Sequence, residues 1–179
     1  MRPLPFLAPV LAVSLAMPAG AALAPGAMAP GFTTRGAIAG KVVRINLAER
    51  LRNGPVVLYF FPAAFTPGCN AEARAFAENI ETFRKAGATV IGMSADAVED
   101  LRKFSASECA GKFAVASAGP AVIHAYDVAL GQPVNGRQVS NRTSYVIARD
   151  GRIVFAHTGM SPAEHISETL DALQKIDSR

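Results

Sequence analysis

The sequence predicts a single α/β domain, with a central mixed β-sheet flanked by helices. Two apolar runs, Val56–Phe61 and Ala88–Ser94, are each followed by a segment with helical periodicity. Further on, two apolar runs joined by Asp150-Gly151 indicate a β-hairpin, and a last amphipathic segment follows it. At 179 residues, half of them apolar, the chain is long enough to bury a core without disulfides.

The first half of the chain starts with a Gly- and Pro-rich entry loop at 23–32. Residues 41–51 predict a short strand and a turn. Val56–Phe61 is continuously apolar, as expected of a strand buried on both faces. Residues 69–86 predict a helix that ends at Gly87. Its apolar residues recur at spacings of three and four, at Ala73, Phe76, Ile80 and Phe83.

The middle of the chain predicts a second buried strand at 88–94. We expect Asp96 to cap a helix that runs to about Glu108. Residues 112–118 predict a short strand or a loop, and residues 121–128 predict a short helix.

The C-terminal part predicts a loop at 131–141 and a hairpin at 143–157. The last helix opens with a capping box formed by Ser161 and Glu164, with Pro162 at its first position. Its inner face consists of Ile166, Leu170, Leu173 and Ile176. The order β-α-β-α, then hairpin, then helix meets the description of a thioredoxin-like fold.

The first 21 residues differ from the rest. Arg2 precedes an apolar stretch, and Ala19-Gly20-Ala21 fits a small-x-small cleavage site, so residues 1–21 predict a secretory signal peptide. The alternative is an uncleaved membrane anchor, but the apolar run is short for a span and is interrupted by prolines. Cleavage leaves residues 22–179 as the domain, destined for an oxidising bacterial periplasm and without a membrane association of its own.

Charge excludes one class of partner. The net charge is +4, but Lys and Arg are scattered and form no basic stripe interleaved with aromatic residues, so we expect no nucleic-acid binding.

His124, His157 and His165 show no ligand spacing with cysteines or carboxylates, which argues against a metal site. A phosphate-binding loop and a haem-attachment motif are also missing.

The stretch from Phe60 to Phe76 holds Cys69, one of two cysteines. A buried strand runs into a Pro/Gly loop, and Cys69 stands where the helix begins. A thiol attacks only as the thiolate, and the free N–H groups of a helix start favour negative charge. Thr66, three residues earlier, adds a hydroxyl that can bond the sulfur or its substrate. The alternative is a small buried cysteine without chemistry.

Three motifs resemble the peroxiredoxin family. P-A-A-F-T-P-G-C, from Pro62 to Cys69, resembles its P-x-x-x-T-x-x-C signature, and FTPGC is most similar to the bacterioferritin comigratory protein, or peroxiredoxin Q, branch. TVIGMSAD, at 89–96, resembles the strand after the first helix of that branch. NRTSYVIARDGRIV, at 141–154, resembles its R-x-T-F-V-I-D-x-D-G-x-I segment, and residues 24–41 look like its N-terminal hairpin.

The resemblance implies a thiol peroxidase with a thioredoxin-like fold. Cys69 would be the peroxidatic cysteine, which a hydroperoxide oxidises to sulfenic acid. Arg142 would hold the thiolate and stabilise the leaving oxygen, Thr66 would position sulfur and peroxide, and Pro62 would shield the sulfur from water. The resemblance also implies an external reductant, thioredoxin-like or a small thiol, and no metal or prosthetic group. Members of the branch are monomers or homodimers.

The second thiol, Cys109, lies forty residues after Cys69. Many members of the branch have a resolving cysteine five residues after the peroxidatic one, where this chain has Arg74. Others place it on the second helix, so the resemblance implies that Cys109 forms a disulfide with Cys69. Two alternatives stay open, namely a free spectator thiol regenerated from outside and a permanent structural disulfide.

Two other functions compete with the peroxidase. A periplasmic thiol–disulfide oxidoreductase shares the fold but needs Cys-x-x-Cys, and Glu72 stands at the position of the second cysteine. A non-catalytic thioredoxin-like binding module has no need of Thr66, Cys69 and Arg142 together. We therefore expect a thioredoxin-dependent type of peroxidase that acts on hydrogen peroxide and small organic hydroperoxides.

Overall fold

The structure is a computed structural model, and it describes residues 22–177. The predicted signal peptide, residues 1–21, lies outside the described residues. The strands are β1 (Thr33–Ile38), β2 (Lys41–Asn46), β3 (Val56–Phe60), β4 (Thr89–Ser94), β5 (Ala114–Ser117), β6 (Thr143–Ile147) and β7 (Ile153–Thr158). The helices are α1 (Leu47–Leu51), α2 (Pro67–Glu78), α3 (Ile80–Lys85), α4 (Val98–Ser107), α5 (Pro120–Ala125) and α6 (Pro162–Asp177).

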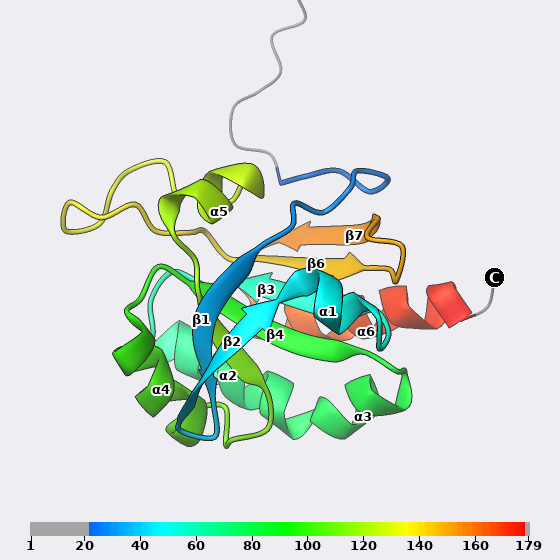
Figure 1. Cartoon of the computed structure of the whole chain (residues 1–179), viewed down its shortest axis with the longest axis horizontal. Helices are drawn as coiled ribbons and strands as arrows, with labels where there is room; N and C mark the ends of the chain where they lie inside the picture. The colour runs from blue at the N-terminus through cyan, green and yellow to red at the C-terminus, as the bar shows by residue number, and fades with distance from the viewer. Residues whose placement is uncertain (1–21, 178–179) are drawn as a thin grey trace, which may run out of the picture.

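The described strands form one mixed sheet in the order β2-β1-β5-β4-β3-β6-β7 (Figure 1). β3 pairs in parallel with β4, and β4 with β5, whereas β6 runs antiparallel to both β3 and β7. The register of β3 and β6 sets Phe60 opposite Thr143. The loop that follows β3 and the residue that precedes β6, Arg142, therefore meet at one edge of the sheet.

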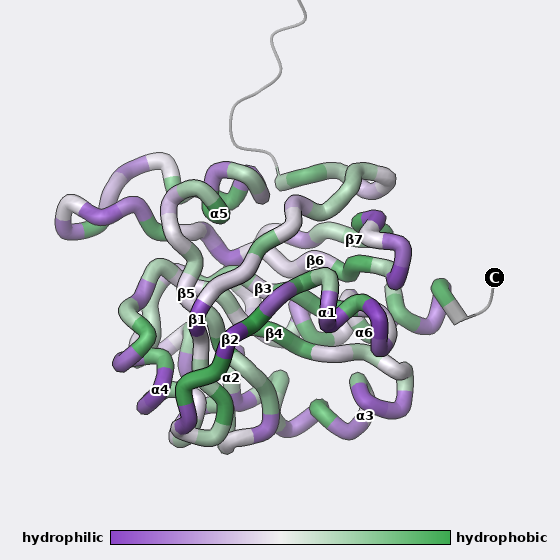
Figure 2. The backbone as a smooth tube through the Cα atoms, in the orientation of Figure 1, coloured by the Kyte–Doolittle hydropathy of each residue, from purple (hydrophilic) through white to green (hydrophobic). Residues whose placement is uncertain are grey.

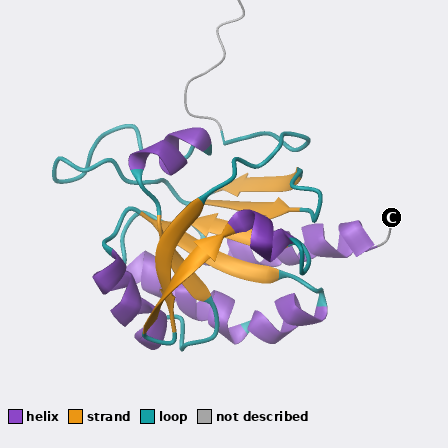
Figure 3. Cartoon of the chain, viewed as in Figure 1, coloured by secondary structure: helices purple, strands orange, loops and turns teal. Residues whose placement is uncertain are grey.

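Helices cover both faces of the sheet (Figure 3). One core layer packs α2, α3, α4 and α6 against alternate residues of β3, among them Tyr59. The other layer packs α1 and α5 against the intervening residues, among them Phe60. Because side chains alternate across a strand, every residue of β3 is buried, as its apolar run predicts. Figure 2 shows hydrophobic residues along β4 and a mixture of hydrophilic and hydrophobic residues along α4. The predicted mixed sheet of a thioredoxin-like fold is confirmed.

Three local expectations were wrong in detail. The predicted helix at 69–86 is divided into α2 and α3 at Asn79, whose side-chain amide donates to the carbonyl of Ala75, a back-bond of the kind that bends helices. Residues after β2 form the short helix α1 rather than a turn, with the side chain of Asn46 accepting from the N–H of Glu49.

Asp96 does not cap α4, and its predicted role is corrected by the structure. The N-cap of α4 is Ala97, which has no side-chain cap. The carboxylate of Asp96 instead accepts hydrogen bonds from Ala64, Ser94 and Arg137. Asp96 binds these partners and not the start of α4, because a buried carboxylate requires several hydrogen-bond donors.

The hairpin follows the sequence expectation, as do the start and the inner face of the last helix. Gly151 adopts a left-handed φ of 87° in the turn between β6 and β7, which is the conformation that glycine tolerates. Pro162 is the first residue of α6, and Ile166 and Leu173 are buried on its inner face. Within residues 22–177, no helix combines the length and the apolarity that a membrane span requires.

Candidate active site

Cys69 lies in the first turn of α2 and is 2% exposed. Thr66 is the N-cap residue, but its hydroxyl donates to the carbonyl of Ala63 at 2.9 Å and makes no cap bond to the helix. The first N–H groups of a helix have no intrahelical acceptor, so those of Gly68 and Cys69 are available to an anion at this end. The helix start thus presents amide donors beside a buried sulfur.

Arg142 brings a positive charge to this sulfur. Its side chain is 4% exposed, and its Nη2 lies 3.5 Å from the Sγ of Cys69. Its backbone carbonyl accepts from the N–H of Gly159, at the end of the neighbouring strand. Gly68 leaves room for the guanidinium, because a Cβ at that position would lie 3.2 Å from Nη2. The structure therefore brings Arg142 and Cys69 together.

Glu72 is a site residue that the sequence reasoning missed. It is one helical turn after Cys69, it is fully buried, and its Oε2 accepts a hydrogen bond from Nη1 of Arg142. Burial raises the pKa of Glu72, and the charge and hydrogen bond of Arg142 offset only part of that rise. The available signal was a carboxylate three residues after a cysteine, on the buried stripe of α2.

His165, on α6, closes the buried cluster. Its Nε2 lies 3.0 Å from the carbonyl oxygen of Gly159, so Nε2 carries the hydrogen and Nδ1 is left as an acceptor. Nδ1 accepts a hydrogen bond from the hydroxyl of Ser144 at 2.7 Å and lies 3.9 Å from Oε1 of Glu72. Burial lowers the pKa of His165 to about 4, partly opposed by its bond to Gly159. His165 is therefore neutral at neutral pH.

Tyr59 forms the floor of this cluster. Its ring stacks on Phe76 with centroids 4.4 Å apart, and its hydroxyl is buried without a hydrogen-bond partner among the described residues. Gly92, opposite it on β4, is required because a Cβ there would lie 2.7 Å from the ring. Burial raises the pKa of Tyr59, and the neighbouring acidic groups of Cys109, Glu72 and Cys69 would raise it further when ionised. The hydroxyl therefore lies within electrostatic range of both thiols.

The loop between β3 and α2 is held by contacts from distant segments. The N–H of Ala64 donates to Oδ2 of Asp96 at 2.7 Å, and Arg137 binds Oδ1 of the same carboxylate at 3.1 Å. Ser140 donates to the carbonyl of Phe61. Phe65 has a left-handed φ of 65° and its ring meets Phe104 edge to face at 5.4 Å. These contacts fix the loop that leads to Cys69.

Cys109 follows α4 and is fully buried in the same core layer as Cys69. Both thiols are free, so no disulfide joins them in this structure. Burial raises the pKa of the Cys109 thiol far above its ordinary value, and the nearby carboxylate of Glu108 adds to the rise. A thiol in this setting is un-ionised and is a poor nucleophile.

Three side-chain contacts fasten the turn that carries Cys109, residues 108–112, to α2 and α3. Arg74 forms an ion pair with Glu108 at 2.7 Å. Lys112 donates to the carbonyl of Ala77, and Arg84 donates to the carbonyl of Lys112, each at 3.0 Å. We call these three contacts the α2–turn clasp. The clasp holds the turn with Cys109 against α2 and α3.

The remaining predicted site residues, Pro62 and Thr66, are near the sulfur in the chain but form no hydrogen bond with it among residues 22–177. Pro62 is half-buried in the loop after β3, and Thr66 is exposed at the N-cap of α2. No hydrogen bond joins the Thr66 hydroxyl to the sulfur within the described part of the chain. The roles predicted for both residues stay predictions.

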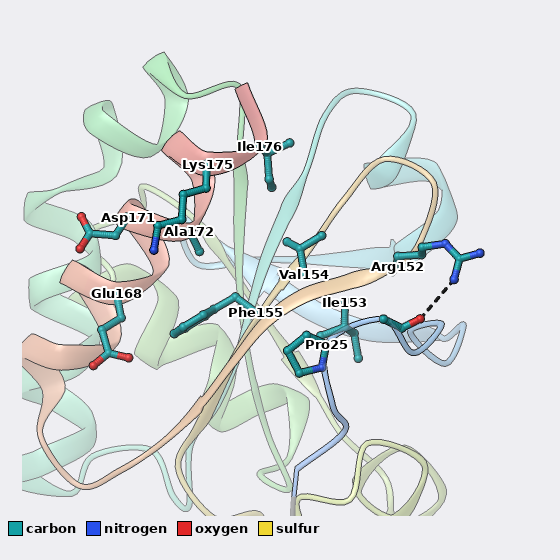
Figure 4. A pocket seen from close by; sticks show the side chains of 11 residues that line it. Pro25, Arg152, Ile153, Val154, Phe155, Glu168, Asp171, Ala172, Lys175 and Ile176 are labelled. Carbon is teal, nitrogen blue, oxygen red and sulfur yellow. Dashed lines mark hydrogen bonds between the residues drawn. The ribbon is translucent and has the colours of Figure 1, made fainter. Parts of the chain in front are cut away.

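A sizeable pocket lies away from the sulfur. A cavity of about 870 Å³ lies between β7 and the end of α6, and Phe155 and Val154 line it together with Glu168 and Lys175 (Figure 4). None of Cys69, Glu72 and Arg142 lines it. Among residues 22–177, no group of three or more His, Cys, Asp or Glu side chains is arranged to hold a metal ion. This cavity is therefore separate from the cluster around Cys69.

Comparisons with known proteins agree with this geometry. Residues 25–156 match the AhpC/TSA family. The chain is 34% identical over 154 residues to peroxiredoxin Q, chloroplastic, from Oryza sativa subsp. japonica, covering 84% of this chain and 67% of that protein. Two solved structures are similar at 28% identity. Peroxidoxin BcpB from Mycobacterium tuberculosis has a TM-score of 0.76, and the match covers 85% of this chain and 97% of that structure. Peroxiredoxin Q from Xanthomonas campestris has a TM-score of 0.67, and the match covers 79% of this chain and 89% of that structure.

Proposed function

Because the chain belongs to the AhpC/TSA family and is a peroxiredoxin of the peroxiredoxin Q type, we propose that Cys69 is the residue with which this thiol-dependent peroxidase attacks its substrate. The observation that carries the proposal is the distance of 3.5 Å between Nη2 of Arg142 and the sulfur, at a helix start with free amides. A guanidinium and amide dipoles both stabilise a thiolate.

The substrates that fit this site are hydrogen peroxide and small organic hydroperoxides. The thiolate of Cys69 attacks the terminal peroxide oxygen, an S–O bond forms, and the O–O bond breaks. Arg142 stabilises the charge that develops on the leaving oxygen, which departs as water or alcohol. Thr66 positions the peroxide with its free lone pairs, and Pro62 keeps water from the sulfur.

For the second half of the cycle, we propose that Cys109 attacks the sulfenic acid and forms a Cys69–Cys109 disulfide. The burial of both thiols in one core layer supports the pairing. The attack requires the α2–turn clasp to open, since Cys109 is fully buried and un-ionised while the clasp is closed. An external reductant, thioredoxin-like or a small thiol, then restores both thiols.

The cycle needs no metal or prosthetic group, because sulfur supplies both electrons of the peroxide reduction. We propose that residues 1–21 direct the protein to the periplasm, where a membrane-crossing system would have to supply the reductant. The protein acts as a monomer or a homodimer on a small peroxide, without nucleic acid.

A thiol–disulfide oxidoreductase is disfavoured by Glu72. This residue occupies the position of the second cysteine in Cys-x-x-Cys, and it is buried against Arg142. A binding module is disfavoured by the same cluster, because burying an arginine, a glutamate and a thiol together costs stability that binding elsewhere does not require.

The test is peroxide consumption by the reduced, purified domain, followed by mass spectrometry. We expect rapid loss of one equivalent of hydrogen peroxide, abolished in Cys69→Ser. The wild type then carries a Cys69–Cys109 disulfide, whereas Cys109→Ser carries an oxidised Cys69 that dimedone traps. A wild type that consumes no peroxide contradicts the function. A wild type in which Cys109 stays reduced contradicts only the disulfide step.

A further inference from the structure

Two acids share one buried cation at this site. Within the described residues, Arg142 is the one Lys or Arg whose side chain is buried. Its Nη2 contacts the sulfur of Cys69, and its Nη1 contacts the carboxyl group of Glu72. A buried cation needs one compensating anion, and a second anion would leave a net buried charge. Cys69 and Glu72 therefore compete for the same positive charge.

The surroundings of Oε1 of Glu72 favour a proton on this oxygen. Oε1 is buried and accepts no hydrogen bond within residues 22–177. The atom that faces it across 3.9 Å is Nδ1 of His165, whose lone pair already accepts from Ser144. An ionised carboxylate oxygen would face this nitrogen without any donor, and burying an unpaired charge costs more than burying the uncharged acid.

The charged and titratable groups that face Glu72 come from four elements. Cys69 is on its own helix, Arg142 precedes β6, His165 is on α6, and Tyr59 is on β3. Among them, Arg142 alone is positively charged at neutral pH, since burial holds His165 neutral. Burial raises the pKa of Glu72, and a thiolate on the same guanidinium would raise it further.

We propose that Glu72 stores a proton for the peroxidase reaction, carrying it while Cys69 is a thiolate and releasing it when Cys69 becomes neutral sulfenic acid. This inference rests on the proposed function. Before the reaction, Arg142 is balanced by the thiolate and Glu72 is neutral. Afterwards, Arg142 is balanced by the carboxylate, so the buried charge is unchanged through the step.

The atoms and electrons balance in this step. The thiolate and the attacked peroxide oxygen form the S–O bond, and that oxygen keeps its hydrogen to give sulfenic acid. The O–O bond breaks, the sulfur is oxidised by two electrons, and the leaving oxygen receives the proton from Glu72 to become water or alcohol. The site carries one negative charge before the step, on the thiolate of Cys69, and one after it, on the carboxylate of Glu72.

The test counts protons during oxidation. Stopped-flow mixing of the reduced domain with one equivalent of hydrogen peroxide, in weak buffer with a pH indicator at neutral pH, reports proton uptake. We expect no net uptake in the wild type. Glu72→Gln has lost the stored proton, so it should take up about one proton from solvent for each sulfenic acid formed. Glu78→Gln, an exposed change on the same helix, should behave as the wild type.

Equal proton counts in the wild type and Glu72→Gln would overturn the proposal. If Glu72→Gln does not fold, the proposal can be tested on the wild type alone, by infrared difference spectra of the oxidised minus the reduced protein. They should show a carboxylic acid band lost and a carboxylate band gained, and Cys69→Ser should show neither. Oxidation without loss of the acid band refutes the proton store, whereas a wild type that does not react with peroxide refutes the proposed function instead.

Discussion

The guanidinium of Arg142 lies 3.5 Å from the sulfur of Cys69, although 73 residues separate them in the sequence. We expect Arg142→Met to slow the reaction with hydrogen peroxide by roughly 10²–10³-fold, as the loss of one oxyanion-stabilising group does. Arg142→Lys should also be slow, because an ammonium cannot bridge the sulfur and Glu72 as a fork does. Stopped-flow rates of peroxide loss measure both, and the exposed Arg149→Met is the control. Unchanged rates would remove Arg142 from the site.

Gly68 keeps a side chain away from that guanidinium. A Cβ at position 68 would lie 3.2 Å from Nη2 of Arg142, so Gly68→Ala should displace the guanidinium from the sulfur. We expect a drop of roughly tenfold in the peroxide rate with little change in stability, in keeping with the sensitivity of catalysis to small misplacements. Gly119→Ala is the control, since Gly119 also lies next to a proline at a helix start and its Cβ would meet open space. Equal rates for the two variants would contradict this account.

His165 should make the fold sensitive to acid. Its pKa is lowered to about 4 in the folded state, from an unfolded value of 6.5. Between these values the unfolded chain binds a proton that the folded chain does not, so stability is lost as the pH falls from 6.5 toward 4, by on the order of 3 kcal/mol. Urea unfolding across this range measures it.

His165→Gln should lack this loss, so the stability curves of the wild type and the variant should converge as the pH falls. Other groups titrate in the same range, but both proteins contain them. His124→Gln, an exposed change, should keep the wild-type slope. Parallel curves for the wild type and His165→Gln would show that His165 is not held neutral by burial.

The α2–turn clasp should limit how fast the disulfide forms. Arg74→Met removes the ion pair with Glu108. Because the Arg74 side chain is largely exposed, the pair stabilises the closed clasp by only about 0.5–1 kcal/mol, so its loss should speed disulfide formation roughly two- to fivefold. Quenched-flow mass spectrometry would follow the Cys69–Cys109 disulfide while the peroxide step stays unchanged. Arg102→Met, which breaks a pair within α4, is the control. Slower disulfide formation in Arg74→Met would refute the clasp.

Tyr59 and Tyr126 should respond in opposite ways to the loss of their hydroxyl groups. Tyr59 has a buried hydroxyl without a partner, so Tyr59→Phe should be neutral or stabilise the fold by up to about 1 kcal/mol. Tyr126 donates to the carbonyl of Pro30 at 2.7 Å, so Tyr126→Phe should destabilise by about 1 kcal/mol. Chemical denaturation compares them. A destabilising Tyr59→Phe would reveal a hydroxyl partner within the cluster.

Local patterns predicted the main elements well. Apolar runs located β3 and β4, and Asp150-Gly151 located the hairpin. Local patterns gave wrong predictions where a side chain forms hydrogen bonds that its sequence neighbourhood does not indicate. Asp96 has the composition of a helix cap, yet it binds Ala64, 32 residues earlier. Asn79 interrupts a periodic helix pattern because its amide bonds a backbone carbonyl, which hydrophobic periodicity does not register.

The sequence by itself determined the strand–loop–helix that presents Cys69, because hydrophobic alternation, glycine and proline act over a few neighbouring residues. The family resemblance also named Arg142, but only the tertiary structure added the other groups around the sulfur. Glu72 and His165 come from α2 and α6, and each looks like an ordinary residue of its helix in the sequence. In the buried site, the single positive charge of Arg142 faces both the thiol of Cys69 and the carboxyl group of Glu72. A buried site tolerates little net charge, and no local sequence pattern indicates that constraint.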